Sequence, residues 1–321
     1  MKSVQELIRT ELFERQLPQW ALARDNFALL KSVRTKTVGF DDFTVKVQFN
    51  PERIRSAVAK VKPATTEKTS CFLCPEARAQ EQMALGYPPS YSILLNPYPI
   101  FSRHLTIPDR QHLPQLIQGR MTDFLILARD LPDFSLLYNG PFCGASIPGH
   151  MHFQAIEKNV LPLEEDSLRK KRLIFSDELG ALYHFPDYLR KVFLLESENP
   201  DWINEKFARI KQLLPLYESQ EKEPRFNLLV QYNHPIWQLY IFPRKAHRPT
   251  QFFEEGDNQI LISPGIVDMT GVLITVRECD FLRLNRELVE DIFRQTSISE
   301  EEEQRIVREL KVELKIALRQ N

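Results

Sequence analysis

The chain has 321 residues, 43% of them hydrophobic and 26% charged, a composition that excludes a disordered or low-complexity protein. Its 42 Lys and Arg residues nearly balance 43 Asp and Glu residues, so a broad basic surface for nucleic acid is not indicated, whereas local anion sites are compatible with it. No stretch of about 18 apolar residues occurs, and the charged N-terminal segment lacks the apolar core of a signal peptide. We therefore expect a cytoplasmic protein with no membrane partner.

Short predicted strands and helices follow one another along the chain. Apolar residues at helical spacing predict helices over 1–23, 121–131, 202–217 and from about 287 onward. Apolar runs, several of them alternating, predict strands at 43–49, 91–95, 104–107, 134–138, 150–156, 181–185, 191–195, 226–232 and 237–242. The segment Ser297-Ile298-Ser299 predicts an N-cap for the acidic run that follows it. Because these elements do not repeat as βαβ units, they favour an α+β fold.

Two of the four cysteines, Cys71 and Cys74, form a CxxC pair. Four cysteines are too few for a disulfide framework in a chain of this length. Such a pair is half of a tetrahedral zinc site, and His104, His112 and His150 are the candidates for the two remaining ligands. A redox pair and two buried thiols are the alternatives, and no strand–CxxC–helix pattern supports the redox interpretation. We predict a structural zinc ion rather than a reactive centre.

The segment 96–108 predicts two strands joined by a turn rich in Pro and Asn. Arg103 and His104 within it can either contact a phosphate or base, or belong to a purely structural connection. The residues themselves favour neither interpretation.

The loop 139–149 carries the densest group of glycines in a chain that has only 10. Glycines let backbone N–H groups approach an anion closely, and the Ser146 hydroxyl adds a donor. The alternative is a plain turn that contains a polar serine. The strand that follows decides between them.

On that predicted strand, His150, His152 and Gln154 alternate with the apolar Met151 and Phe153. Period-two alternation directs the three polar side chains to one face of the sheet. Alone, this pattern is also typical of two partly exposed histidines. Beside a glycine-rich loop, a nucleophilic imidazole suits the transfer of a phosphorus group, so we predict a catalytic site.

At these residues the chain resembles the transferase branch of the histidine-triad superfamily, in which His-x-His-x-Gln replaces the His-x-His-x-His of the hydrolases. That branch holds galactose-1-phosphate uridylyltransferases, diadenosine tetraphosphate phosphorylases and GDP-L-galactose phosphorylases. The likeness covers about residues 70–158, and a looser similarity to the phosphorylases runs through 241–244 and 263–271. It implies a histidine-triad-like antiparallel sheet with flanking helices.

The resemblance also implies roles for individual residues. His152 matches the nucleophile that attacks an α-phosphorus and forms a nucleotidyl-histidine intermediate, and Gln154 matches the residue that holds the phosphoryl oxygens. Ser146, with Asn139 and the Gly144 backbone, matches the phosphate-contacting loop, and we count Ser146 with His152 and Gln154 as the candidate catalytic residues. The implied zinc ligands are Cys71, Cys74, His112 and His150. The candidate substrate contacts are Asn139, Gly140 and Gly144 of the loop, with Arg103 and His104.

A second copy of the strand pattern occurs later in the chain. Phe-Ser-Leu-Leu at 134–137 and Phe-Asn-Leu-Leu at 226–229 each precede a loop and another strand. We interpret residues 1–175 as a half with the active site, 176–285 as a half without the histidine motif, and 286–321 as a charged C-terminal helix.

Met151 stands where the uridylyltransferases have Pro, which favours the phosphorylase side of the branch. The resemblance therefore implies a nucleotidyltransferase or phosphorylase that cleaves a nucleoside polyphosphate or nucleoside diphosphate sugar at the α-phosphorus. Phosphate or a sugar phosphate would then accept the nucleotidyl group. A hydrolase that uses the same histidine, and a non-catalytic nucleotide-binding protein on the same scaffold, are the alternatives.

Overall fold

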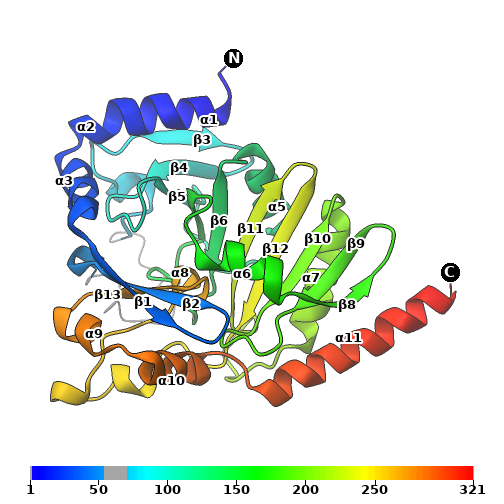
Figure 1. Ribbon diagram of the computed structural model, residues 1–321. Helices are drawn as coiled ribbons and strands as arrows, with labels where there is room; N and C mark the ends of the chain where they lie inside the picture. Colours follow the sequence, from blue (N-terminus) through cyan, green and yellow to red (C-terminus); the bar gives the residue numbers. More distant parts are fainter. Residues whose placement is uncertain (1, 54–70, 321) are drawn as a thin grey trace.

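The structure, a computed structural model, describes residues 2–53 and 71–320 (Figure 1). Two sheets form its framework, a large antiparallel one and a small one, and helices pack on them. The predicted α+β fold with an antiparallel sheet and flanking helices is confirmed. No helix of the described ranges is long and apolar enough to cross a membrane.

The large sheet has ten strands, and all its neighbouring pairs are antiparallel. Their order is β3 (Ala84–Tyr87), β4 (Tyr91–Leu95), β5 (His104–Pro108), β7 (His152–Glu157), β6 (Phe134–Asn139), β11 (Phe226–Asn233), β12 (Ile236–Pro243), β10 (Phe193–Ser197), β9 (Gly180–His184) and β8 (Arg172–Ser176). The small sheet contains β1 (Arg34–Gly39), β2 (Thr44–Phe49) and β13 (Val272–Thr275).

The same strand order occurs twice in the large sheet. Strands β3, β4, β5, β7 and β6 run from one edge to the centre, and β8, β9, β10, β12 and β11 run from the other edge. The two runs meet where β6 pairs with β11. The limits of two halves at residues 175 and 285 stay a prediction.

Helices lie along both faces and the ends of the large sheet (Figure 1). They are α1 (Val4–Leu7), a π-helical stretch (Ile8–Gln16), α2 (Leu17–Gln19), α3 (Ala21–Leu29), α5 (Met121–Asp130), α6 (Pro162–Lys170), α7 (Pro200–Leu213), α8 (Ile266–Met269), α9 (Glu278–Arg283), α10 (Arg286–Thr296) and α11 (Glu300–Gln320). Short 3₁₀ turns occupy Leu30–Ser32, Pro51–Arg53, Pro75–Ala77, Thr250–Phe252 and Gly256–Asn258.

The last predicted helix divides into α10 and α11 at the predicted cap. The Ser299 hydroxyl accepts from the backbone N–H of Glu302, whose carboxylate in turn accepts from the N–H of Ser299. This reciprocal capping satisfies two donors at the start of α11 and explains why the helix begins there.

One face of strand β7 packs against an apolar cluster of the core, and the other face carries the candidate site residues. Phe153 stacks on Phe124 of α5 with ring centroids 4.7 Å apart, and Met151 and Ala155 join the same apolar cluster. Burial of a side chain such as Phe153 contributes roughly 2–3 kcal/mol. His152 and Gln154 therefore face the opposite side of the sheet, as the alternation predicts.

Candidate active site

The structure brings together the four residues that the resemblance implies as zinc ligands. The Cys71 Sγ lies 3.2 Å from His150 Nδ1, and the Cys74 Sγ lies 3.2 Å from His112 Nδ1. All four ligand atoms lie within 4.8 Å of one another. Tetrahedral zinc with these donors would separate them by about 3.4–3.8 Å. The cluster can therefore hold a metal ion.

The tautomer of His150 suits metal binding. Its Nε2 lies 2.8 Å from the backbone carbonyl of Asp109, which can only accept, so Nε2 carries the proton. The lone pair of Nδ1 then faces the sulfur atoms. The carboxylate of Asp109 is itself held by Arg120 at 2.6 Å. Such outer partners orient metal-bound histidines.

His152 is oriented in the same way, but its free nitrogen faces a cavity. Its Nδ1–H donates to the carbonyl of His150 at 2.8 Å, which leaves the Nε2 lone pair unprotonated. Gln115 accepts from the His152 backbone N–H at 2.8 Å and donates to its carbonyl at 2.9 Å. Burial lowers the pKa of His152 to about 4. The imidazole is therefore fixed in the form that can act as a nucleophile.

His104 fixes Gln154 rather than reaching a substrate. The backbone N–H of Ile100 donates to His104 Nδ1, so His104 Nε2 carries the proton and donates to the Gln154 amide oxygen at 2.8 Å. The Gln154 amide nitrogen is thereby left as the donor of this side chain. Burial lowers the pKa of His104 to about 3 and keeps it neutral. Arg103, by contrast, places its guanidinium 4.3 Å from the centre of the Phe134 ring and does not join the site.

The glycine-rich loop packs against a distant segment of the chain. The side-chain oxygen of Asn139 accepts from the backbone N–H of Ile266 and from the amide of Asn227, each at 2.7 Å. A Cβ on Gly140 would lie 2.9 Å from a backbone oxygen, and Gly144 adopts a φ of 94°. The loop is thus held in one conformation by residues that no local pattern connects to it.

Replacing Gly144 with Ala is expected to lower the thermal midpoint of unfolding by several degrees. A left-handed φ costs a non-glycine residue roughly 1–2 kcal/mol. In addition, the new Cβ would lie 2.6 Å from the Cα of Gly265. Gly119→Ala is the matched control, because Gly119 also has a positive φ, of 74°, but nothing within 4 Å of its Cβ position. Equal effects of the two variants would contradict this account of the loop.

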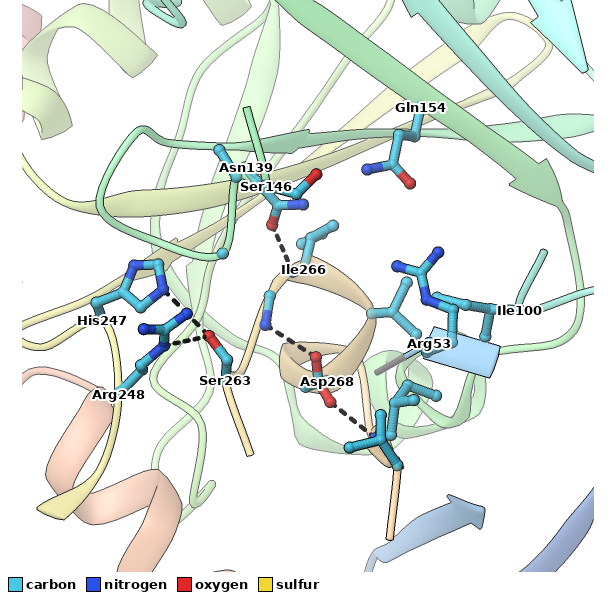
Figure 2. Close-up of a pocket in the computed structure, with 16 residues that line it drawn as sticks. Arg53, Ile100, Asn139, Ser146, Gln154, His247, Arg248, Ser263, Ile266 and Asp268 are labelled. Atoms are coloured by element: carbon cyan, nitrogen blue, oxygen red, sulfur yellow. Dashed lines mark hydrogen bonds between the residues drawn. The ribbon is translucent and has the colours of Figure 1, made fainter. Parts of the chain in front are cut away.

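Two cavities meet beside His152. The larger, of about 580 Å³, contains His152 and is walled mainly by apolar and aromatic side chains, among them Trp20, Phe72, Pro97 and Tyr98. The smaller, of about 80 Å³, is polar and is drawn in Figure 2. Three residues line both cavities, namely Arg53, Ser146 and Gln154. They mark the junction at which a transferred group can sit.

Arg53 is a site residue that the sequence did not suggest. Its guanidinium donates to the carbonyl of Tyr98 at 2.7 Å and faces Gln154 in Figure 2. Burial lowers its pKa to about 10, so it stays cationic at neutral pH. The small cavity also contains His247, Arg248 and Ser263, which likewise lay outside the predicted set. A cationic guanidinium at the junction suits a phosphate oxygen.

Glu223 is a buried carboxylate near Gln115, the residue that orients His152. This buried carboxylate accepts from the Tyr138 hydroxyl at 2.6 Å and from the Ile117 backbone N–H, two residues from Gln115. Burial raises the pKa of Glu223 from 4.5 to about 7. The folded state thus holds this proton more tightly than the unfolded state, so stability is lost as pH rises from 4.5 to 7.

Replacing Glu223 with Gln removes that loss. The free energy of unfolding of Glu223→Gln minus that of the natural chain is expected to rise by roughly 1–3 kcal/mol from pH 5 to pH 8. Urea denaturation at the two pH values measures it. A constant difference between the two proteins across this range would show that Glu223 does not titrate there.

A family model described as "Domain of unknown function (DUF4922)" matches residues 12–157, the part of the chain that holds all predicted site residues. The solved structure of the yeast Ap4A phosphorylase Apa2 aligns with 86% of this chain and with 96% of the Apa2 chain, at 16% sequence identity and a TM-score of 0.59. The chain shares its fold. Apa2 in complex with Ap4A gives 15% identity and a TM-score of 0.56, over 88% of this chain and 97% of that one.

The same yeast protein in complex with AMP gives 16% identity and a TM-score of 0.57, over 88% of this chain and 96% of that one. No curated protein matches the sequence. The resemblance to the transferase branch is thus confirmed at the level of the fold.

Proposed function

We propose that the protein is a nucleotidyltransferase of the phosphorylase type that works through His152. One observation carries the proposal: the unprotonated Nε2 of His152 faces a cavity whose wall also holds the Gln154 amide and the Ser146 hydroxyl. A nucleophile beside donors for phosphoryl oxygens is the arrangement that covalent phosphorus transfer requires. The fold supports the proposal, because the yeast phosphorylase that shares it binds AMP and Ap4A.

The large cavity would hold the nucleoside, with its base against aromatic side chains such as Phe72 and Tyr98. The α-phosphate would lie at the junction of the cavities. There the Nε2 lone pair of His152 attacks phosphorus, the bond from phosphorus to the bridging oxygen breaks, and the leaving group departs as a phosphate. The Nδ1–H of His152 keeps its hydrogen bond to the His150 carbonyl throughout, and this bond stabilises the positive charge that develops on the imidazole. An acceptor oxygen then displaces the imidazole.

We propose zinc as the metal for the cluster of Cys71, Cys74, His112 and His150, because two thiolates and two imidazoles suit this ion. When bound, the ion would cross-link the loop before Pro75 to the start of β7. With four protein ligands it has no open position, so its role is structural. It would hold the His150 carbonyl, to which His152 donates.

The covalent intermediate provides the test. Incubation with a panel of nucleoside triphosphates, nucleoside diphosphate sugars and dinucleoside polyphosphates is expected to add the mass of one nucleoside monophosphate to the chain. The adduct should be labile in acid and should map to the peptide that contains His152. A chain that gains no such mass with any member of the panel would support the non-catalytic interpretation.

Gln154→His addresses the hydrolase alternative. Gln154 has no dissociable proton, so it cannot protonate a poor leaving group or activate water as a third histidine can. The variant is expected to release free nucleoside monophosphate from the intermediate faster than the natural chain does, by roughly 10-fold or more. The measurement is decay of the purified adduct in buffer. Equal decay rates would show that Gln154 does not set the choice between transfer and hydrolysis.

A further inference from the structure

Strands β6 and β7 separate just before they reach the candidate nucleophile. The two strands pair as far as Leu137 and Gln154. The same register, continued by two residues, would join Asn139 to His152. Instead, Asn139 stays with β6 along β11, and His152 stays with β7 along β5. The large sheet therefore forks at the residue that we propose as the nucleophile.

The side-chain amide of Gln115 fills this fork. Its Nε2 donates to the carbonyl of Asn139 at 3.0 Å and to the carbonyl of His152 at 2.9 Å. Its Oε1 accepts from the backbone N–H of His152 at 2.8 Å. The side chain of Gln115 is fully buried. Because an amide side chain carries the same donor and acceptor groups as a peptide bond, Gln115 replaces a missing rung of the ladder.

The backbone of Gln115 is fixed to both arms of the fork. Its N–H donates to the carbonyl of Pro148, in the loop that precedes β7, at 3.1 Å. Its carbonyl accepts from the hydroxyl of Tyr138, on β6, at 3.4 Å. Nearby, the N–H of Met151 donates to the carbonyl of Leu113 at 2.6 Å. The position of the amide in the fork is thus determined by the segments on either side of it.

Gln115 lines neither of the two cavities beside His152, so it acts on a bound substrate only through its neighbours. Two of its three side-chain bonds fix the backbone of His152, and the bond from Nδ1 to the His150 carbonyl fixes the ring. Together these bonds set the direction of Nε2. The third bond fixes Asn139, whose side chain accepts from the N–H of Ile266. One amide therefore sets the separation of the nucleophile from the glycine-rich loop.

Resting on the proposed function, we propose that Gln115 is a positioning residue that holds the fork open and keeps His152 aligned with the phosphorus at the junction. Without the amide, the N–H of His152 and the carbonyl of Asn139 would be buried and unpaired, which is costly. These two groups are complementary, so the strands are expected to close by one rung. Closure would move His152 relative to the junction, and a misplacement of about 1 Å costs roughly 100-fold in rate.

The variant Gln115→Met keeps the length of the side chain and removes its three hydrogen bonds. The donor is the member of the nucleotide panel that labels the natural chain. In a single turnover, the variant is expected to form the adduct at least about 100-fold more slowly. Calorimetry should find its Kd for the corresponding nucleoside monophosphate within about 3-fold of the natural value, because Gln115 does not line the cavities.

Gln118→Ala is the matched control, since Gln118 is exposed on the same loop and should label and bind as the natural chain does. Labelling of Gln115→Met at the natural rate would overturn the inference. So would a parallel loss of labelling and of nucleotide binding, which would assign Gln115 a role in folding alone. In both cases the nucleotidyl transfer by His152 would stand.

The variant Gln115→Glu decides the matter if Gln115→Met does not fold. It keeps the size of the side chain and an oxygen for the N–H of His152, but an ionised carboxylate has no proton to donate to the two carbonyls. It is expected to slow adduct formation at least about 10-fold while the Kd for the nucleoside monophosphate stays within about 3-fold. An unchanged rate in this variant would also overturn the inference.

A measurement without nucleotide separates this inference from the proposed function. NMR of the full chain labelled with nitrogen-15 histidine reports the tautomer of each ring at neutral pH, and the signal absent from His152→Ala identifies His152. The natural chain is expected to show the Nδ1–H tautomer, and Gln115→Met a mixture, because the ring is no longer held on the His150 carbonyl. If no nucleotide labels the natural chain, a single Nδ1–H tautomer in Gln115→Met overturns the inference and a mixture supports it.

Discussion

The variant His152→Ala is expected to lose nucleotidyl transfer by at least about 10³-fold and to form no covalent adduct. The reason is that Nε2 of His152 faces the large cavity beside the junction and is unprotonated, because the proton of the neutral ring is on Nδ1. His104 is buried behind Gln154, and its Nε2 is occupied as a donor. His247 lies at the far end of the small cavity. Neither can replace His152 as the nucleophile.

Steady-state turnover and intact mass after incubation with the donor measure this effect. His234→Ala is the matched control, because His234 lies in the turn between β11 and β12, away from both cavities. Within the described residues, its ring forms a hydrogen bond with the Tyr232 hydroxyl alone. It should retain full activity and full labelling. A His152→Ala protein that still forms the adduct would place the nucleophile elsewhere and remove the basis of the proposed function.

The parts of the site that the sequence could predict are those encoded locally. Cys71 and Cys74 belong to a chelating CxxC spacing, and His152 and Gln154 follow the two-residue period of a strand. The structure places all four where these patterns predict. The prediction for His150 was only partly right, because β7 begins at His152. The backbone N–H groups of residues 150 and 151 bond to Ile147 and Leu113 instead of a neighbouring strand, and this turns His150 toward the cysteines.

Other site residues carry no local signal. Gln115 orients His152, but an isolated glutamine in a loop has no pattern that predicts a buried bond to a residue 37 positions away. Arg244 and Ser263 belong to the segments with a loose similarity to the phosphorylases, but that similarity gave them no role. Ser263 lines the small cavity and Arg244 donates to the neighbouring Pro264 carbonyl, beside the place where β6 pairs with β11. Long-range pairing of this kind is set by tertiary packing, so a single sequence does not display it.

Removal of the metal is expected to lower the thermal midpoint of unfolding by at least about 10 °C, since structural zinc sites supply folding free energy directly. The local packing explains why. Among the described residues, the apolar cluster around Cys71 and Cys74 contains, besides these two cysteines, only Leu73 and the partly buried Ile147. Because this apolar contact is small, we expect a metal cross-link to contribute much of the stability of the loop. Metal analysis should find one zinc ion per chain, and thermal unfolding after chelation measures the loss.

Cys71→Ser should reproduce the effect of chelation, whereas Cys279→Ser, at an exposed cysteine on α9, should bind zinc and unfold as the natural chain does. Activity should fall together with stability. When His150 is no longer anchored by its Nδ1, its carbonyl no longer holds the Nδ1 proton of His152, so the nucleophilic tautomer is not selected. A chelated protein of unchanged thermal midpoint and turnover would show that the cluster is two buried thiols beside two histidines. In the proposed mechanism, the Cys pair and His152 are therefore coupled through His150, whose Nδ1 faces Cys71 and whose carbonyl oxygen accepts from His152.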